Sequence, residues 1–341
     1  MIEVKHLTKR YGDHTAVSDL SFTIEKGKIY GFLGPNGAGK STTMNIMTGC
    51  LAASSGEVSI GGHDIYEEAE EAKRLIGYLP EIPPVYPDRT PREYLTFVAR
   101  AKGVPEKELK EQVEKVMRVT QITELGDRLI KNLSKGYRQR VGIAQAILGD
   151  PEIIILDEPT VGLDPRQIIE IRTLIKKLGE DHTVILSSHI LAEVQAVCET
   201  ILIISGGKLI ACDTPDNLEK LFASAITVDL TAEASLSEIR ELLEPLPQIS
   251  AVNALSEEEG RCSVRIETKA GADDSVCRFI FFAFARAQKP ILEMKMAKAS
   301  LEEIFIELTE GQKAEAAAAE SAELLEEAMT DEPEEKEADP E

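Results

Sequence analysis

The feature that most constrains the fold of this sequence is a glycine-rich stretch near the N-terminus, which reads Gly34, Pro35, Asn36, Gly37, Ala38, Gly39, Lys40, Ser41 and Thr42. It matches the pattern G-x-x-x-x-G-K-[ST] and follows an apolar run, Lys28–Leu33, that predicts a buried strand. In such a loop, backbone N–H groups turn toward the phosphates of a nucleotide, and the N-terminus of the next helix adds partial positive charge. We therefore expect a P-loop α/β fold, in which Lys40 contacts the β- and γ-phosphates and the Ser41 hydroxyl ligates Mg²⁺.

A second apolar run, Ile153–Leu156, ends in two carboxylates, Asp157 and Glu158. In a P-loop protein, an aspartate at this place holds Mg²⁺ through its water shell. The glutamate that follows can orient the attacking water and act as general base. On its own, an Asp-Glu pair after a strand would equally fit a turn and a helix N-cap. Combined with the P-loop, it predicts hydrolysis of a bound nucleotide.

Several shorter motifs stand in a fixed order around the P-loop and this acidic pair. Together they make the chain resemble the ATP-binding subunit of an ABC transporter over residues 2–221. The matching positions are the signature residues Ser134, Lys135 and Gly136, the D-loop residue Asp164, the switch residue His189 and the adenine-stacking residue Tyr11. Each of these residues alone would also fit an ordinary core or turn position.

The resemblance implies a mechanism that one copy of the chain cannot complete. In this family, two ATP-binding subunits, identical or closely related, pack head-to-tail around Mg-ATP, and the signature of one covers the P-loop of the other. Ser134 and Gly136 would supply donors to the γ-phosphate, because they begin a helix. His189 would also contact the γ-phosphate, and Glu158 would activate water. Reopening of the pair after hydrolysis would drive a separate integral membrane permease.

The sequence departs from the family pattern at two places. The signature has Lys135 where glycine is usual and Tyr137 where glutamine is usual. Lys135 adds charge near the expected interface. The glutamine of the family's Q-loop is replaced by Glu81. A carboxylate there could still ligate Mg²⁺. The alternative is that Glu81 is a solvated loop residue.

The domain organisation follows from changes of pattern along the chain. Residues 2–221 alternate strands and helices, as expected for an ABC-type ATPase core with a largely parallel sheet, and a helical subdomain is expected at 83–149. Residues 225–310 restart the alternation and predict a small α+β accessory domain, with a ferredoxin-like arrangement as one possibility and a capping box at Ser300–Glu303. Residues 312–341 predict an acidic, disordered tail.

Charge and hydropathy narrow the class of partner. The formal net charge of −22 argues against binding to nucleic acid, which requires an excess of Lys and Arg. The sequence shows no signal peptide and no charge-free apolar run long enough to cross a bilayer. We expect a cytoplasmic subunit that is peripheral at the inner face of the cell membrane and serves an exporter permease. The alternatives are an importer subunit, or a soluble ABC ATPase that acts on a nucleic-acid or ribosomal complex.

Overall fold

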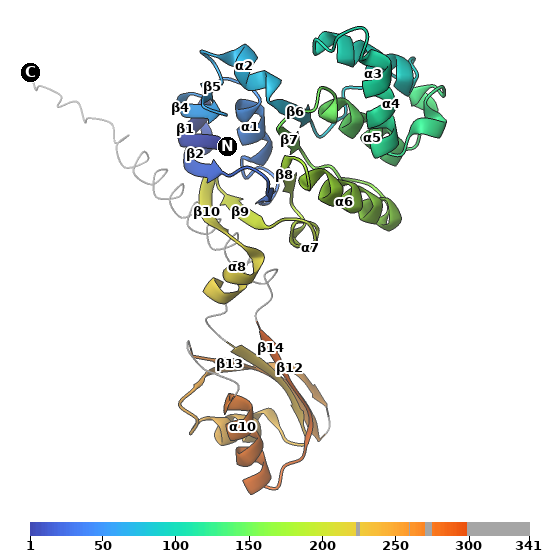
Figure 1. Ribbon diagram of the computed structural model, residues 1–341. Helices are drawn as coiled ribbons and strands as arrows, with labels where there is room; N and C mark the ends of the chain where they lie inside the picture. Colours follow the sequence, from blue (N-terminus) through green and yellow to red (C-terminus); the bar gives the residue numbers. More distant parts are fainter. Residues whose placement is uncertain (223–225, 259, 270–274, 299–341) are drawn as a thin grey trace, which may run out of the picture. The chain divides into compact units, whose positions relative to one another are not determined.

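The computed structural model describes residues 1–222, 226–258, 260–269 and 275–298. It divides into two compact units, one ending at Thr214 and the other beginning at Pro215 (Figure 1). The domain boundaries that the sequence suggests, 2–221 and 225–310, stay predictions. The capping box at Ser300–Glu303 and the tail at 312–341 lie outside the described residues.

A six-stranded sheet forms the centre of the first unit. Its strands lie in the order β10-β9-β3-β8-β7-β6, and all neighbouring pairs are parallel except β9 and β10. This confirms the expected, largely parallel sheet. The strands are β3 (Ile29–Leu33), β6 (Ile76–Leu79), β7 (Ile153–Leu156), β8 (Thr183–Ser188), β9 (Thr200–Ser205) and β10 (Lys208–Asp213).

A second, antiparallel sheet, which the sequence did not lead us to expect, covers one side of this core. Its order is β2-β1-β4-β5, and helix α1 shares a buried apolar cluster with both sheets. The pairing of β1 with β2 shifts register along its length, so the period-2 pattern that marks a strand is interrupted. These elements are β1 (Ile2–Tyr11), β2 (His14–Ile24), β4 (Ser55–Ile60), β5 (His63–Asp64) and α1 (Lys40–Met47).

Helices α3, α4 and α5 pack against one another and form a separate layer of the first unit (Figure 1). They fall inside the stretch where a helical subdomain was expected. Their bounds are α3 (Pro91–Ala101), α4 (Leu109–Val119) and α5 (Lys135–Ile147), with short 3₁₀ turns at Thr123–Leu125 and Ile130–Asn132. The remaining helices of the unit are α2 (Ala69–Arg74), α6 (Pro165–Gly179) and α7 (Leu191–Gln195).

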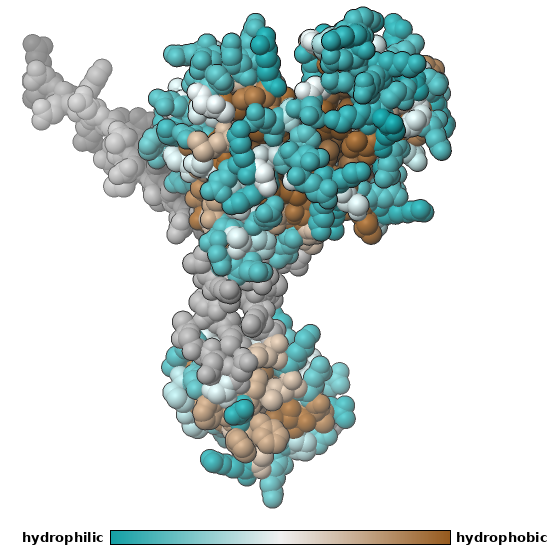
Figure 2. Space-filling model, viewed as in Figure 1, coloured by the Kyte–Doolittle hydropathy of each residue, from teal (hydrophilic) through white to brown (hydrophobic). Residues whose placement is uncertain are grey.

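The second unit has its own core. Its elements follow the order βαββαβ after helix α8, and its antiparallel sheet has the order β12-β13-β11-β14, which is the ferredoxin-like arrangement that the sequence suggested. Apolar side chains also reach its surface, among them those of Phe279, Phe281 and Phe282 on α10 (Figure 2). Its elements are α8 (Pro215–Phe222), β11 (Ile226–Ala232), α9 (Leu236–Leu243), β12 (Ile249–Glu258), β13 (Arg261–Thr268), α10 (Ser275–Arg286) and β14 (Ile291–Lys298).

Within the described ranges, none of these helices combines the length and the apolar character needed to span a bilayer.

Candidate active site

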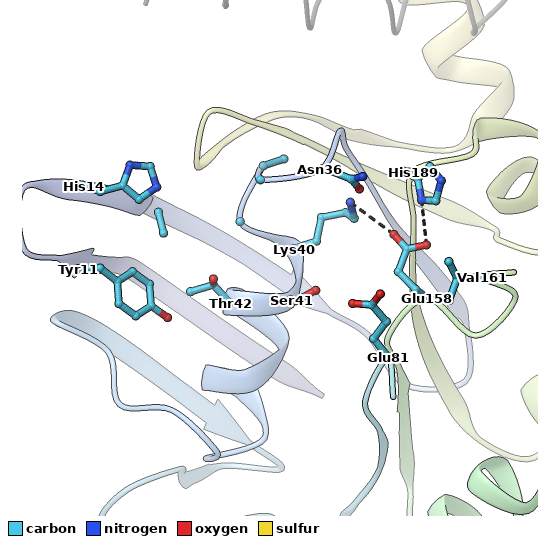
Figure 3. Close-up of a pocket in the computed structure, with 14 residues that line it drawn as sticks. Tyr11, His14, Asn36, Lys40, Ser41, Thr42, Glu81, Glu158, Val161 and His189 are labelled. Carbon is cyan, nitrogen blue, oxygen red and sulfur yellow. Dashed lines mark hydrogen bonds and ion pairs between the residues drawn. The ribbon is translucent and has the colours of Figure 1, made fainter. Parts of the chain in front are cut away.

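The carboxyl ends of the parallel strands meet at one edge of the central sheet, where ligands bind in folds of this kind. The P-loop leaves β3 there and enters α1, as its motif predicts. A cavity of about 570 Å³ opens beside it (Figure 3). The cavity is lined by Tyr11, His14, Ala16, Asn36, Gly37, Ala38, Gly39, Lys40, Ser41, Thr42, Glu81, Glu158, Val161 and His189.

Lys40 is buried at the base of this cavity and is surrounded by oxygen atoms. Its ammonium donates hydrogen bonds to the carbonyl oxygens of Gly34 at 2.8 Å and Pro35 at 3.2 Å. It also lies 3.5 Å from Glu158 Oε1. Burial lowers the pKa of Lys40, and the nearby carboxylates, that of Glu158 foremost, oppose this shift. The P-loop thus holds one cation at the place where phosphate oxygens would need it.

Asp157 is held between two hydroxyl groups at the end of β7. Ser41 Oγ donates to Asp157 Oδ1 at 3.1 Å, and Ser187 Oγ donates to the same oxygen at 2.6 Å. Ser187 also accepts a hydrogen bond from the backbone N–H of Glu158 at 2.8 Å. Ser187 lies beside Asp157 because β8, which carries it, is located between β3 and β7 in the sheet. Sequence reasoning missed Ser187, since only strand order brings it to the acidic pair.

Glu158 faces the cavity from an unusual backbone conformation. Its φ of 46° lies in the left-handed region, which a non-glycine residue rarely adopts outside sites where the surroundings enforce it. Its other oxygen, Oε2, lies 3.0 Å from Nδ1 of His189 (Figure 3). The acidic residue, the histidine and Lys40 therefore form one cluster. Glu81 reaches the same cavity from the segment after β6.

The opposite wall comes from the antiparallel sheet. Tyr11 ends β1 and is 49% exposed, with the ammonium of Lys9 lying 5.1 Å from the centre of its ring. His14 begins β2 on the same side (Figure 3). An exposed aromatic ring at the mouth of a cavity can stack on a nucleotide base. No sequence motif identifies the three further lining residues, which are His14, Ala16 and Val161. They line the site because neighbouring strands and loops place them there.

The signature residues do not line this cavity. Ser134 is the N-cap of α5, where its hydroxyl accepts from the N–H of Tyr137, and Asp164 is the N-cap of α6, where it accepts from Gln167. The two helix starts are packed together: a Cβ built on Gly136 would lie 2.6 Å from the Gln167 side chain, and one on Gly162 would lie 2.3 Å from Lys135 Nζ. Gly162 has a φ of +67°, so a side chain there would be strained as well as crowded.

The chain matches known proteins over most of its length. A family model described as "ABC transporter" matches residues 17–161. The linearmycin resistance ATP-binding protein of Bacillus subtilis is 32% identical over 311 residues, covering 91% of this chain and 98% of that protein. The bacitracin transport ATP-binding protein of Bacillus licheniformis is 38% identical over 222 residues, covering 64% of this chain and 72% of that protein.

Solved structures show the same likeness for the ATPase part. The ATP-binding subunit of an ABC transporter shares 31% identity at a TM-score of 0.59, covering 65% of this chain and 93% of that one. A dimeric ATP-binding cassette in a post-hydrolysis state, bound to ADP and Pi, shares 26% identity at a TM-score of 0.57, covering 63% and 98%. With its P-loop, acidic pair and cavity, the chain belongs to the ATP-binding proteins of ABC transporters and is an ATP-hydrolysing subunit.

Proposed function

We propose that this chain binds Mg-ATP between its own P-loop and the signature of a second copy or related subunit, and that hydrolysis powers export through a separate membrane permease. The observation that carries this proposal is the single cavity that brings Lys40, Glu158 and His189 together. Lys40 attracts the β- and γ-phosphates, Glu158 orients and deprotonates the attacking water, and His189 contacts the γ-phosphate and steadies Glu158.

The oxygen atoms near Ser41 fit a magnesium ion. Ser41 Oγ and Asp157 Oδ1 face each other at 3.1 Å, and the Glu81 carboxylate opens onto the same cavity. Hydroxyl and carboxylate oxygens, together with water, are the ligands that Mg²⁺ prefers. When bound there, Mg²⁺ would neutralise charge on the β- and γ-phosphates. Ser187 keeps the Asp157 carboxylate turned toward Ser41.

The position of the signature supports a site that needs two subunits. Ser134 and Lys135 are exposed at the N-terminus of α5 and lie outside the chain's own nucleotide cavity. N–H groups at a helix start are suited to bind phosphate oxygens. A second copy that presents this helix start to the P-loop would complete the donor set, with Asp164 in the adjoining turn at the interface. Lys135 would add a positive charge that a glycine lacks.

A groove on the helical subdomain supports docking to a permease. A cavity of about 600 Å³ lies along the segment before α3 and along that helix as far as its last turn. It combines aromatic and basic side chains, which is the mixture enriched at protein interfaces. Its lining residues are Tyr86, Arg89, Arg92, Glu93, Tyr94, Thr96, Phe97 and Arg100. The residues of this groove follow closely on Glu81 in the chain, so a change at the nucleotide cavity could be transmitted to a partner bound in the groove. A permease bound there would hold this subunit at the inner face of the membrane.

Export is proposed from the relatives' roles. One of them is a linearmycin resistance protein, another a bacitracin transport protein, and a third, 28% identical over 91% of this chain, is a Nod factor export protein of Cupriavidus metallidurans. The matches of the linearmycin resistance and Nod factor export proteins each cover 91% of this chain, so they extend beyond the ATPase core into the second unit.

The proposed roles are tested by separating ATP binding from hydrolysis. In Glu158→Gln the water loses its base while Lys40 is retained, so we expect turnover to be lost and the dissociation constant for ATP to stay near that of the wild type. In Lys40→Ala we expect ATP affinity itself to fall. The matched control is Glu152→Gln, because Glu152 makes an exposed ion pair with Lys26 away from the cavity. Full hydrolysis by Glu158→Gln, or unchanged binding by Lys40→Ala, would contradict the assignment.

A further inference from the structure

Helix α7 carries a buried carboxylate that the proposed mechanism does not use. Glu193 is 6% exposed. Its Oε2 accepts hydrogen bonds from two hydroxyl groups, those of Thr160 and Ser188, the second at 3.1 Å. Among the described residues, no Lys, Arg or His nitrogen lies within 4.0 Å of it. Burying a carboxylate without a cation is costly, and these charge-assisted bonds are what offsets that cost.

The two hydroxyl groups come from the two segments that carry the reacting side chains, namely the loop after β7 and the end of β8 with the loop that follows it. Thr160 follows Glu158 in the sequence Glu158-Pro159-Thr160, and Ser188 directly precedes His189. On the cavity side, these loops touch through Glu158 Oε2 and His189 Nδ1, 3.0 Å apart (Figure 3). On the buried side, they are joined through the single oxygen of Glu193. The same two loops are therefore bridged twice, once by the reacting groups and once by this carboxylate.

The helix that supplies the carboxylate is itself fixed to the P-loop strand. Val194 packs so closely on Gly31 of β3 that a Cβ at Gly31 would lie 2.1 Å from its Cγ1. Ser188 is tied to the start of α7 as well, because its hydroxyl accepts from the N–H of Ile190 at 3.0 Å. The position of Glu193 is thus set by the strand that leads into the P-loop. Through its hydrogen bonds, Glu193 in turn fixes the positions of both loops.

We propose that Glu193 is a positioning residue for ATP hydrolysis, which fixes the separation of Glu158 and His189 by accepting hydrogen bonds from Thr160 and Ser188. The inference rests on the roles proposed above for Glu158 and His189. It requires an acceptor oxygen at this place and not a negative charge, since both hydroxyls donate to one atom. A displacement of the loops would slow the chemical step and leave the Lys40 side of the cavity unchanged.

The test compares two replacements in the full-length chain. Glu193→Gln keeps an acceptor oxygen, whereas Glu193→Met keeps the length of the side chain and removes the acceptor. We expect Glu193→Met to lower kcat by about 10- to 100-fold, the range that a misplaced catalytic group costs, with KM and the ATP dissociation constant unchanged. Glu193→Gln should retain most of the activity. The matched control is Glu199→Gln, since Glu199 accepts from the N–H of Ile29 at 3.2 Å at the far end of β3.

The outcomes separate positioning from a purely structural role. If Glu193→Met keeps the wild-type kcat, or if kcat and ATP affinity fall together, the inference is wrong. If Glu193→Met does not fold, Thr160→Val decides, because it removes one donor and should lower kcat with KM unchanged. Unchanged kcat in Thr160→Val would then overturn the inference. Glu158→Gln is assayed alongside, and full activity in that variant would refute the proposed catalytic roles independently of Glu193.

Discussion

At the scale of single residues, the groups that would act on ATP are each held by a specific polar partner. Lys40 is held by carbonyl oxygens of its own loop, Asp157 by Ser41 and Ser187, and Glu158 by His189. Such partners matter because a catalytic side chain that moves by a fraction of an ångström loses much of its effect. Substitution of the buried hydroxyl groups should therefore affect ATP hydrolysis, as substitution of the charged residues should.

Ser187→Ala tests this point. The substitution leaves Asp157 with one hydroxyl partner and the N–H of Glu158 without its acceptor. We expect a lower kcat and a higher Mg²⁺ concentration for half-maximal activity, measured by steady-state ATPase assays at varied Mg²⁺. The matched control is Thr120→Val, which removes a buried hydroxyl bonded within the helical subdomain. An unchanged Mg²⁺ dependence in Ser187→Ala would show that this hydroxyl does not orient Asp157.

Candidate site residues could be named from the sequence where a motif signals them, and not where only the fold brings them to the site. The P-loop could be identified because its residues act together within one turn, and Asp157 and Glu158 because they follow a buried strand. Ser187, His14 and Glu193 could not be identified in this way. Each reaches the site, or the loops around it, through the order of strands or the packing of a helix, and none stands in a local pattern that signals it.

At the scale of elements, the buried parallel strands were the most predictable. Strands β7 and β8 are buried along their whole length because both faces are covered, so β7 is entirely apolar and β8 has an apolar centre. By contrast, β12 was missed: it is an edge strand whose second half is exposed and contains glutamates. The antiparallel sheet of β1 and β2 was missed because register shifts interrupt the alternation of buried and exposed residues.

The contact between α7 and β3 gives an element-scale prediction. Gly31→Ala would place a Cβ within 2.1 Å of Val194 Cγ1 and 2.8 Å of Cys198 Sγ. We expect a loss of about 1–3 kcal/mol in the free energy of unfolding, the usual cost of overpacking, measured by urea denaturation. Val194→Ala in the same chain removes the closer of these contacts and should recover part of that loss. Additive losses in the double variant would show that the two side chains do not compete for the space.

At the scale of the whole molecule, the described part of the chain has two cores, and the site that we propose for it needs a second subunit. The second unit buries its own apolar cluster, centred on residues such as Phe284, Val228 and Val264. The sequence offered a ferredoxin-like arrangement for it as one possibility, because most of its strands and helices have regular patterns, but β12 was not recognised. The proposed pairing of the signature with a second P-loop lies beyond one chain, and rests on where Ser134 and Lys135 are exposed.

Phe284→Ala tests whether the two cores are independent. Phe284 is fully buried in the second unit, so its truncation should cost about 3–5 kcal/mol of that unit's stability. We expect a denaturation transition of the second unit at lower denaturant concentration, while the ATP dissociation constant stays unchanged. A parallel loss of ATP affinity would mean that the second unit supports the nucleotide cavity.

We propose that this ATPase works on a membrane permease. The most direct measurement is to tag the full-length chain in its native cell, solubilise the membranes gently and identify what co-purifies, with Lys40→Ala as a comparison. We expect a polytopic membrane protein in near-equal amount with the wild-type chain. Recovery from the soluble fraction alone, with ribosomes or nucleic-acid complexes attached, would leave the ATP chemistry intact and contradict the transport function.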